Sequence, residues 1–174
     1  MIHNVHERDL PVPADRLGAL VDGVAERDNP LWPAPPWPPM RLDRPLGAGA
    51  TGGHGPIRYH CVRHVPGREV EFAFDPAVGM EGTHTLAVLD GPSPGHSVLR
   101  HVLQGRPRSP WTVLRWAFMI RWLHDALLED LLDNAARAVG HPPDRPARWS
   151  PWVRLVRAIM LPSTPQGSSA PTGR

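Results

Sequence analysis

The sequence has 174 residues, 41% of them hydrophobic, which is enough for one domain with a substantial core and too few for two. All 19 basic side chains are arginine, but the net charge is only +2, which argues against nucleic acid as a partner. The single cysteine, Cys61, excludes an internal disulfide and a multi-thiolate metal site and favours a cytoplasmic setting, and no run of ~20 apolar residues predicts an integral membrane span.

The first part of the chain predicts a strand, a short helix and an aromatic segment. Residues 2–10 alternate as in a strand, and ADRLGALVDGVAER has apolar residues at helical spacing. LWPAPPWPPM, residues 31–40, then combines five prolines with two tryptophans. Such rigid chain suits either a docking tag or the wall of a cavity. Its place between a helix and a strand favours the wall, with Trp32 or Trp37 buried against the cavity.

A glycine-rich segment and an antiparallel meander follow. GAGATGGHG, residues 47–55, is expected to form a turned or mobile loop, because glycine holds regular structure at an entropic cost. Four strand-like runs separated by turn signals then occupy residues 57–104, and with residues 2–10 and the short run RLDRPL they make at most six strands. By alternation, one side of the sheet should be lined by Val70, Phe72, Phe74, His84, Leu86, Val88, Leu99, His101 and Leu103.

A long helix is predicted from Ser109 to about Val139. Ser109 and Pro110 supply an N-cap and a first-turn proline, and Gly140 is placed to end the helix. The apolar stripe that should lie on the sheet contains Val113, Ala117, Ile120, His124, Leu127, Leu128, Leu131, Ala135 and Ala138. The acidic side chains expected on the solvated face are Asp125, Glu129, Asp130 and Asp133.

These elements suggest one domain over residues 1–140, a linker at 141–150, an amphipathic helix at 151–161 and a disordered, low-complexity tail at 162–174. The apolar face of the 151–161 helix is expected to contain Trp152, Leu155, Val156 and Ile159. That helix could dock on the domain, associate with a second copy to give a homo-oligomer, or graze an anionic membrane. Its two arginines make the membrane the least favoured of the three.

The order of elements resembles the helix-grip fold of the START-like (SRPBCC) superfamily, which includes polyketide cyclases, dehydrases and lipid-transfer proteins. The resemblance covers residues 1–140 and rests on VPADRLGALVD, on GTHTLAVLD with HSVLRHVLQG, and on WLHDALLEDLLDNAAR. It implies an α+β fold in which a curved antiparallel sheet wraps around a long C-terminal helix, with a short helix after the first strand. It also implies an apolar cavity between sheet and helix, without a catalytic residue shared by the superfamily.

Three histidines are expected to point into this cavity. His124 lies in the middle of the helical stripe, and His84 and His101 alternate inward on neighbouring strands. They could be hydrogen-bonded core histidines, or acid/base or ligand-contacting groups near neutral pH. A zinc site is a third possibility, but no ligand-spacing motif supports it, so no metal is predicted.

Further candidates complete the predicted site. Tyr59 could polarise a ligand carbonyl, or could be a core tyrosine with a satisfied hydroxyl. The expected apolar contacts of the ligand are Trp32, Trp37, Phe72 and Phe118.

The leading hypothesis is a protein that binds a small hydrophobic or aromatic molecule, with enzyme activity left open. The activity would be cofactor-free cyclase or dehydratase chemistry, with His84, His101 and His124 moving protons and Tyr59 polarising a carbonyl. The alternatives are a non-catalytic carrier or sensor of lipid-like ligands, and an interaction module that uses the Pro/Trp segment and the C-terminal helix.

Overall fold

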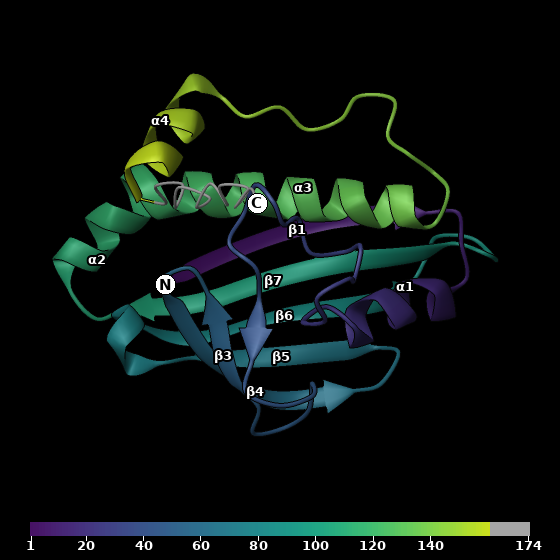
Figure 1. The fold of residues 1–174 in the computed structure, drawn as a ribbon, viewed down its shortest axis with the longest axis horizontal. Helices are drawn as coiled ribbons and strands as arrows, with labels where there is room; N and C mark the ends of the chain where they lie inside the picture. Colours follow the sequence, from purple (N-terminus) through teal and green to yellow (C-terminus); the bar gives the residue numbers. More distant parts are fainter. Residues whose placement is uncertain (161–174) are drawn as a thin grey trace, which may run out of the picture.

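A computed structural model describes residues 1–160, so the tail expected at 162–174 lies outside the described residues. Seven strands form one antiparallel sheet in the order β1-β7-β6-β5-β4-β3-β2 (Figure 1). The strands are β1 (Ile2–Leu10), β2 (Arg41–Leu42), β3 (Thr51–His54), β4 (Ile57–Val65), β5 (Glu69–Phe74), β6 (Met80–Asp90) and β7 (Ser97–Pro107). The helical elements are α1 (Ala14–Asp22), a 3₁₀ turn η1 (Pro76–Val78), α2 (Pro110–Arg115), a π-helical turn η2 (Trp116–Ile120), α3 (Arg121–Ala138) and α4 (Pro151–Met160).

The core lies between the sheet and the helices α1 and α3, which cover the same face of it (Figure 1). The strands contribute side chains at every second position, because alternate residues of a strand point to opposite faces. The largest buried cluster joins Leu17 and Val21 of α1 to Leu131 of α3 through Val70 and Leu99 of the sheet. This arrangement is the predicted helix-grip fold.

The sheet has one strand more than the sequence predicted, because the glycine-rich segment contains β3. Gly52 pairs with both Leu42 and Tyr59 in neighbouring strands. A Cβ atom on Gly52 would lie 1.9 Å from the carbonyl oxygen of Arg41. Glycine is therefore required for the close approach of β2 to β3, and the segment is not simply a loop.

Both predicted ends of the long helix are confirmed. The Oγ of Ser109 accepts a hydrogen bond of 3.1 Å from the backbone N–H of Thr112, and Pro110 follows in the first turn. Gly140, at φ 88°, adopts the left-handed conformation after the last turn, and the N–H of His141 donates to the carbonyl of Ala136.

The first half of this helix departs from the predicted stripe because it contains η2. A π turn contains one residue more than an α turn. In the part of the helix that precedes the π turn, the residues that face the sheet are therefore shifted by one position in the sequence. Thr112 and Trp116 consequently face the cavity described below, whereas Val113 and Ala117, which were expected to pack on the sheet, are exposed.

The acidic side of α3 is not a solvated face as expected, because it forms a ladder of polar contacts with β1. The contacts are Asn4 with Asp125, His6 with Asp125 and Glu129, and Arg8 with Glu129 and Asp133. Two residues of a strand advance about 6.6–6.8 Å and four residues of a helix about 6 Å, so the two rows stay in register. Asp133 is only 2% exposed.

The Pro/Trp segment and residues 141–150 both pack against the outer side of α3. The carboxylate of Asp130 accepts hydrogen bonds from the indole N–H groups of Trp37 and Trp149, at 2.7 and 2.8 Å. The backbone N–H of Ala147 donates to Asp133 at 2.8 Å. The predicted linker therefore runs back over α3 toward α4 and is attached to α3 through Ala147 and Trp149 (Figure 1).

α4 contacts α3 through a face that shares only Val156 with the predicted one. Val153 and Val156 are buried against Leu123, Leu127 and Trp37. The three other residues of the predicted face are exposed: Trp152, Leu155 and Ile159. None of the helices in residues 1–160 combines the length and apolarity needed to cross a bilayer.

Candidate functional site: a histidine-lined cavity

A cavity of about 380 Å³ lies between the sheet and the long helix. Its floor comes from the inward faces of β5, β6 and β7, its roof from α2, η2 and α3, and one side from the Pro/Trp segment. The apolar lining includes Trp32, Trp37, Phe72, Phe74, Met80, Leu86, Leu103, Trp116, Ile120, Leu123 and Leu127. Four imidazoles interrupt this surface: His54, His84, His101 and His124.

The three histidines predicted from the sequence do come together. His84 and His101 stand on neighbouring strands in diagonal positions, with His84 Nδ1 3.4 Å from His101 Nε2. The ring of His124 lies 5.2 Å from that of His101 and 5.8 Å from the indole of Trp116, between centroids. The rings of Phe72 and Phe74 stack on His84, each with a centroid separation of 5.2 Å. One row of imidazoles therefore runs across the cavity from sheet to helix.

Burial keeps these imidazoles neutral near pH 7. It lowers the pKa of His84 to about 3, and the neighbouring imidazoles of His54 and His124 disfavour its protonation further. Burial likewise lowers the pKa of His101 far below its usual value. The pKa of His124 is also lowered by burial, although the Asp125 carboxylate, 3.9 Å from its Nδ1, opposes that effect. A neutral imidazole offers one donor and one acceptor nitrogen.

Several of these nitrogens have no hydrogen-bond partner within residues 1–160. They are His84 Nε2, His101 Nδ1 and His124 Nδ1. A buried polar atom without a partner costs roughly 1–3 kcal/mol, so a ligand oxygen or nitrogen that pairs with one would recover part of that cost.

His54 is a site residue that the sequence analysis missed. It lies at the end of β3, lines the cavity and packs at a tilt against Trp32, with ring centroids 5.0 Å apart. Burial lowers its pKa to about 3. The sequence predicts a loop at residues 47–55, and a loop gives no inward or outward direction to a histidine. Only the pairing of β3 with its neighbours places His54 toward the cavity.

Tyr59 is buried behind the cavity lining, not in it. Its hydroxyl lies 3.1 Å from His54 Nδ1, and its ring packs against Phe72 and His84. Burial raises the pKa of this phenol, so it keeps its proton and can donate to His54. Tyr59 can thus reach a ligand only through His54.

His6 was also missed, and it extends the row of imidazoles to the edge of the sheet. Its ring lies 6.2 Å from that of His124 and is held between Asp125 and Glu129 at 3.0 and 2.9 Å. The pKa of His6 is raised, chiefly by the hydrogen bond with Asp125. Burial is the next largest effect and acts in the opposite direction, lowering the pKa. Atoms of His6, His124 and Asp125 lie within 4.8 Å of one another, a spacing that could hold a metal ion. The alternation of β1 was the available signal for His6.

The predicted apolar contacts divide into two groups. Trp32, Trp37 and Phe72 line the cavity, and Trp37 is only 3% exposed, as expected for a wall. Phe118 does not line it and is 63% exposed. Trp116 and Ile120 line the cavity, and Phe118, two helical residues from each of them, therefore lies on the other side of the helix.

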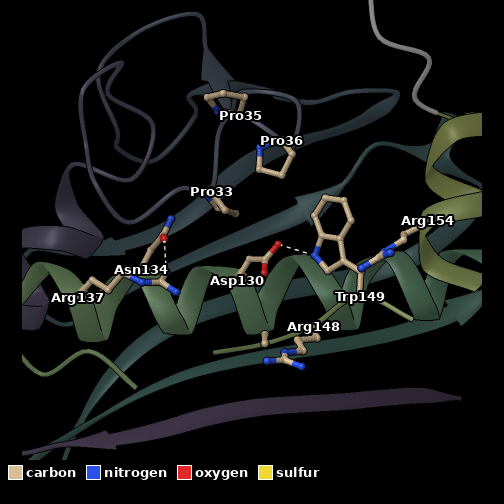
Figure 2. A pocket seen from close by; sticks show the side chains of 10 residues that line it. Pro33, Pro35, Pro36, Asp130, Asn134, Arg137, Arg148, Trp149 and Arg154 are labelled. Carbon is tan, nitrogen blue, oxygen red and sulfur yellow. Dashed lines mark hydrogen bonds between the residues drawn. The ribbon is translucent and has the colours of Figure 1, made fainter. Parts of the chain in front are cut away.

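A second, more open hollow of about 420 Å³ lies on the outside of α3 (Figure 2). Pro33, Pro35 and Pro36 border one side of it, and Asp130 and Trp149 the other. Asp130 is occupied by the two indole N–H groups, and no histidine or cysteine lines this hollow. The enclosed, histidine-lined cavity is therefore the candidate functional site.

No family model and no curated protein matches this sequence. Among solved structures, a Thermobifida fusca protein matches at a TM-score of 0.57 and 16% identity, covering 83% of this chain and 99% of that one. Norcoclaurine synthase from Thalictrum flavum, in complex with dopamine and hydroxybenzaldehyde, matches at 0.59 and 14%, covering 82% and 90%. CalU16 from Micromonospora echinospora matches at 0.56 and 13%, covering 91% and 83%.

At these identities the comparisons establish the fold alone. The fold is the predicted helix-grip fold, in which a curved antiparallel sheet packs around a long helix.

Proposed function

We propose that this protein binds a small, largely apolar aromatic molecule in the cavity between the sheet and α3. The observation that carries the proposal is the cavity, about 380 Å³, whose walls are aromatic and aliphatic with imidazoles between them. Small-molecule sites commonly measure about 300–1,000 Å³ and combine apolar walls with a few polar groups. Dopamine and hydroxybenzaldehyde, the molecules bound to norcoclaurine synthase, are small aromatic compounds, which supports this class of ligand for the same fold.

We further propose that the imidazoles act on a ketone-bearing ligand. A cofactor-free cyclisation or dehydration needs a base that removes a proton next to a carbonyl and a donor that polarises the carbonyl oxygen. His124 suits the base best, because Asp125 opposes the lowering of its pKa. His84, with its pKa near 3, is a poor proton acceptor at neutral pH and suits a hydrogen bond to a ligand oxygen, together with His101.

The first test fills the cavity. Leu103 is 2% exposed and lines the cavity floor, so Leu103→Trp should weaken the binding of a neutral phenylnaphthylamine dye by ~10-fold or more, because the indole occupies the ligand's space. Dye fluorescence on titration measures this. Leu89→Trp, the same change on the outer face of β6, is the matched control and should bind like the wild type. Equal dye affinity in both variants would contradict the proposal.

The second test separates an enzyme from a carrier. In heavy water, proton NMR can follow deuterium exchange at the carbon next to the carbonyl of a hydroxyphenyl ketone. An enzyme should accelerate this exchange, and His124→Gln should slow it by about 10²–10⁴-fold, the usual contribution of a general base, with dye affinity retained. His84→Gln is the comparison and should have the smaller effect on exchange. If the wild type binds the dye without accelerating exchange, the protein is a carrier.

A further inference from the structure

The exposed apolar side chains of this protein are concentrated at one end. Of the twelve large hydrophobic residues that are exposed within residues 1–160, eight lie in the segments 111–122 and 152–159. We call this set the apolar end: Trp111, Val113, Leu114, Phe118, Trp122, Trp152, Leu155 and Ile159. Its most exposed members are Trp111, Phe118 and Ile159, at 66, 63 and 65%. Monomeric soluble proteins rarely expose so many large apolar side chains together.

The two segments form one surface. α2 and α4 stand next to each other at the same end of the molecule, above the sheet (Figure 1). The indole N–H of Trp152 donates to the carbonyl of Phe118 at 3.0 Å, which joins α4 to η2. α4 is held there by the burial of Val153 and Val156, and within residues 1–160 its other side, with Trp152, Leu155 and Ile159, is exposed.

The charge around the apolar end has a single sign. Residues 106–124 and 145–160 contain eight arginines and no aspartate or glutamate, although the whole chain carries a net charge of only +2. Within the described residues, Arg108, Arg115 and Arg154 have no carboxylate within ion-pair distance. Tryptophans and arginines beside exposed aliphatic residues are the composition of surfaces that enter the interface of an anionic bilayer.

We propose that the apolar end docks on the surface of an anionic membrane, with the exposed side chains in the headgroup region and the arginines on lipid phosphates. Membrane docking goes beyond the proposed ligand binding. The test of docking does not depend on whether a ligand binds in the cavity. The net positive surface favours anionic lipid because polybasic segments are attracted to such leaflets by about 1 kcal/mol for each basic residue. The same end borders the cavity, since Arg115, Trp116 and Met160 line it.

The experiment measures co-sedimentation of the full chain with vesicles of equimolar phosphatidylglycerol and phosphatidylcholine, and with phosphatidylcholine alone. We expect binding to the anionic vesicles, weaker binding to the neutral ones, and loss at high salt, because salt screens exposed charges. The triple variant Trp111→Ser, Phe118→Ser, Ile159→Ser should lower affinity for anionic vesicles by ~10-fold or more. Arg108→Gln with Arg154→Gln should lower it by about fivefold per arginine.

The matched control is Val5→Ser, Val62→Ser, Val65→Ser, which removes three exposed apolar side chains from the outer face of the sheet and should bind like the wild type. Thermal unfolding verifies that both triple variants fold. The salt dependence of vesicle binding is measured on the wild type and therefore tests the proposal even if a variant fails to fold. Absence of wild-type binding to anionic vesicles would overturn the proposal. So would a dimer in light scattering that the Trp111/Phe118/Ile159 variant dissociates while vesicles bind neither protein, because the surface would then be an interface between copies.

Discussion

Asp133→Ala should lower the free energy of unfolding by about 3 kcal/mol, because removing one partner of a buried ion pair leaves the other without compensation. The Asp133 side chain is 3% exposed and pairs with Arg8, at the β1 end of the polar ladder, and with Arg137 at 3.6 Å. It also accepts the backbone N–H of Ala147. Its loss would therefore loosen β1 and residues 141–150 together.

Urea unfolding followed by circular dichroism measures this effect. Asp144→Ala is the matched control, since Asp144 is exposed in the same 141–150 segment and should change stability by less than about 0.5 kcal/mol. The double substitution Arg8→Met, Asp133→Leu should recover much of the loss, because an apolar pair replaces both charges. A stability of Asp133→Ala equal to that of the wild type would contradict the stabilising role of Asp133.

The protein should lose stability steeply as the pH falls below about 6.5. In the unfolded chain histidine takes up a proton near its ordinary pKa of 6.5, whereas burial holds the pKa of His54 and His84 near 3 and that of His101 far below 6.5. The unfolded state therefore binds more protons than the folded state. The free energy of unfolding consequently decreases as the pH is lowered. Each imidazole contributes about 1.4 kcal/mol per pH unit, or roughly 4 kcal/mol per unit for three.

His6 acts with the opposite sign. Because its contacts with Asp125 and Glu129 raise its pKa, its stabilisation is complete below pH 6.5 and is lost as the pH rises through the folded pKa. Below pH 6.5 His6 therefore adds no slope of its own, and its effect on the free energy of unfolding lies between pH 6.5 and its higher folded pKa. Urea unfolding at neutral pH and in acid gives the slope, and His84→Phe should reduce it by about one proton. His60→Phe, on the exposed face of β4, should leave it unchanged, and a flat profile in the wild type would contradict the assignment.

The sequence predicts the elements that local chemistry determines. Ser109 and Gly140 mark the ends of the long helix because a cap and a left-handed turn are properties of single residues. Strand alternation placed His84 and His101 on the inner face, and helical periodicity brought His124 toward them. Three of the four imidazoles that line the cavity are therefore predictable from the sequence alone.

The remainder depends on contacts between distant segments. β3 exists because Gly52 permits the close approach of β2, which glycine content alone does not distinguish from a loop. Val113 and Ala117 are exposed, contrary to the prediction, because one extra residue in the π turn shifts the face of the helix that meets the sheet. Asp133 was expected in solvent because its partner, Arg8, lies 125 residues away in the chain.

The position of β1 also has a consequence for the order of folding. β1 pairs only with β7 in the sheet, from Ile2↔Gly105 to Leu10↔Ser97, and its polar ladder reaches α3. During synthesis β1 therefore remains unpaired until β7, nearly a hundred residues later in the chain, has been made. Pairing between strands so distant in sequence slows folding. The polar residues of β1, among them His6, Glu7, Arg8 and Asp9, keep this unpaired segment from being a continuous apolar run, which limits aggregation of the nascent chain.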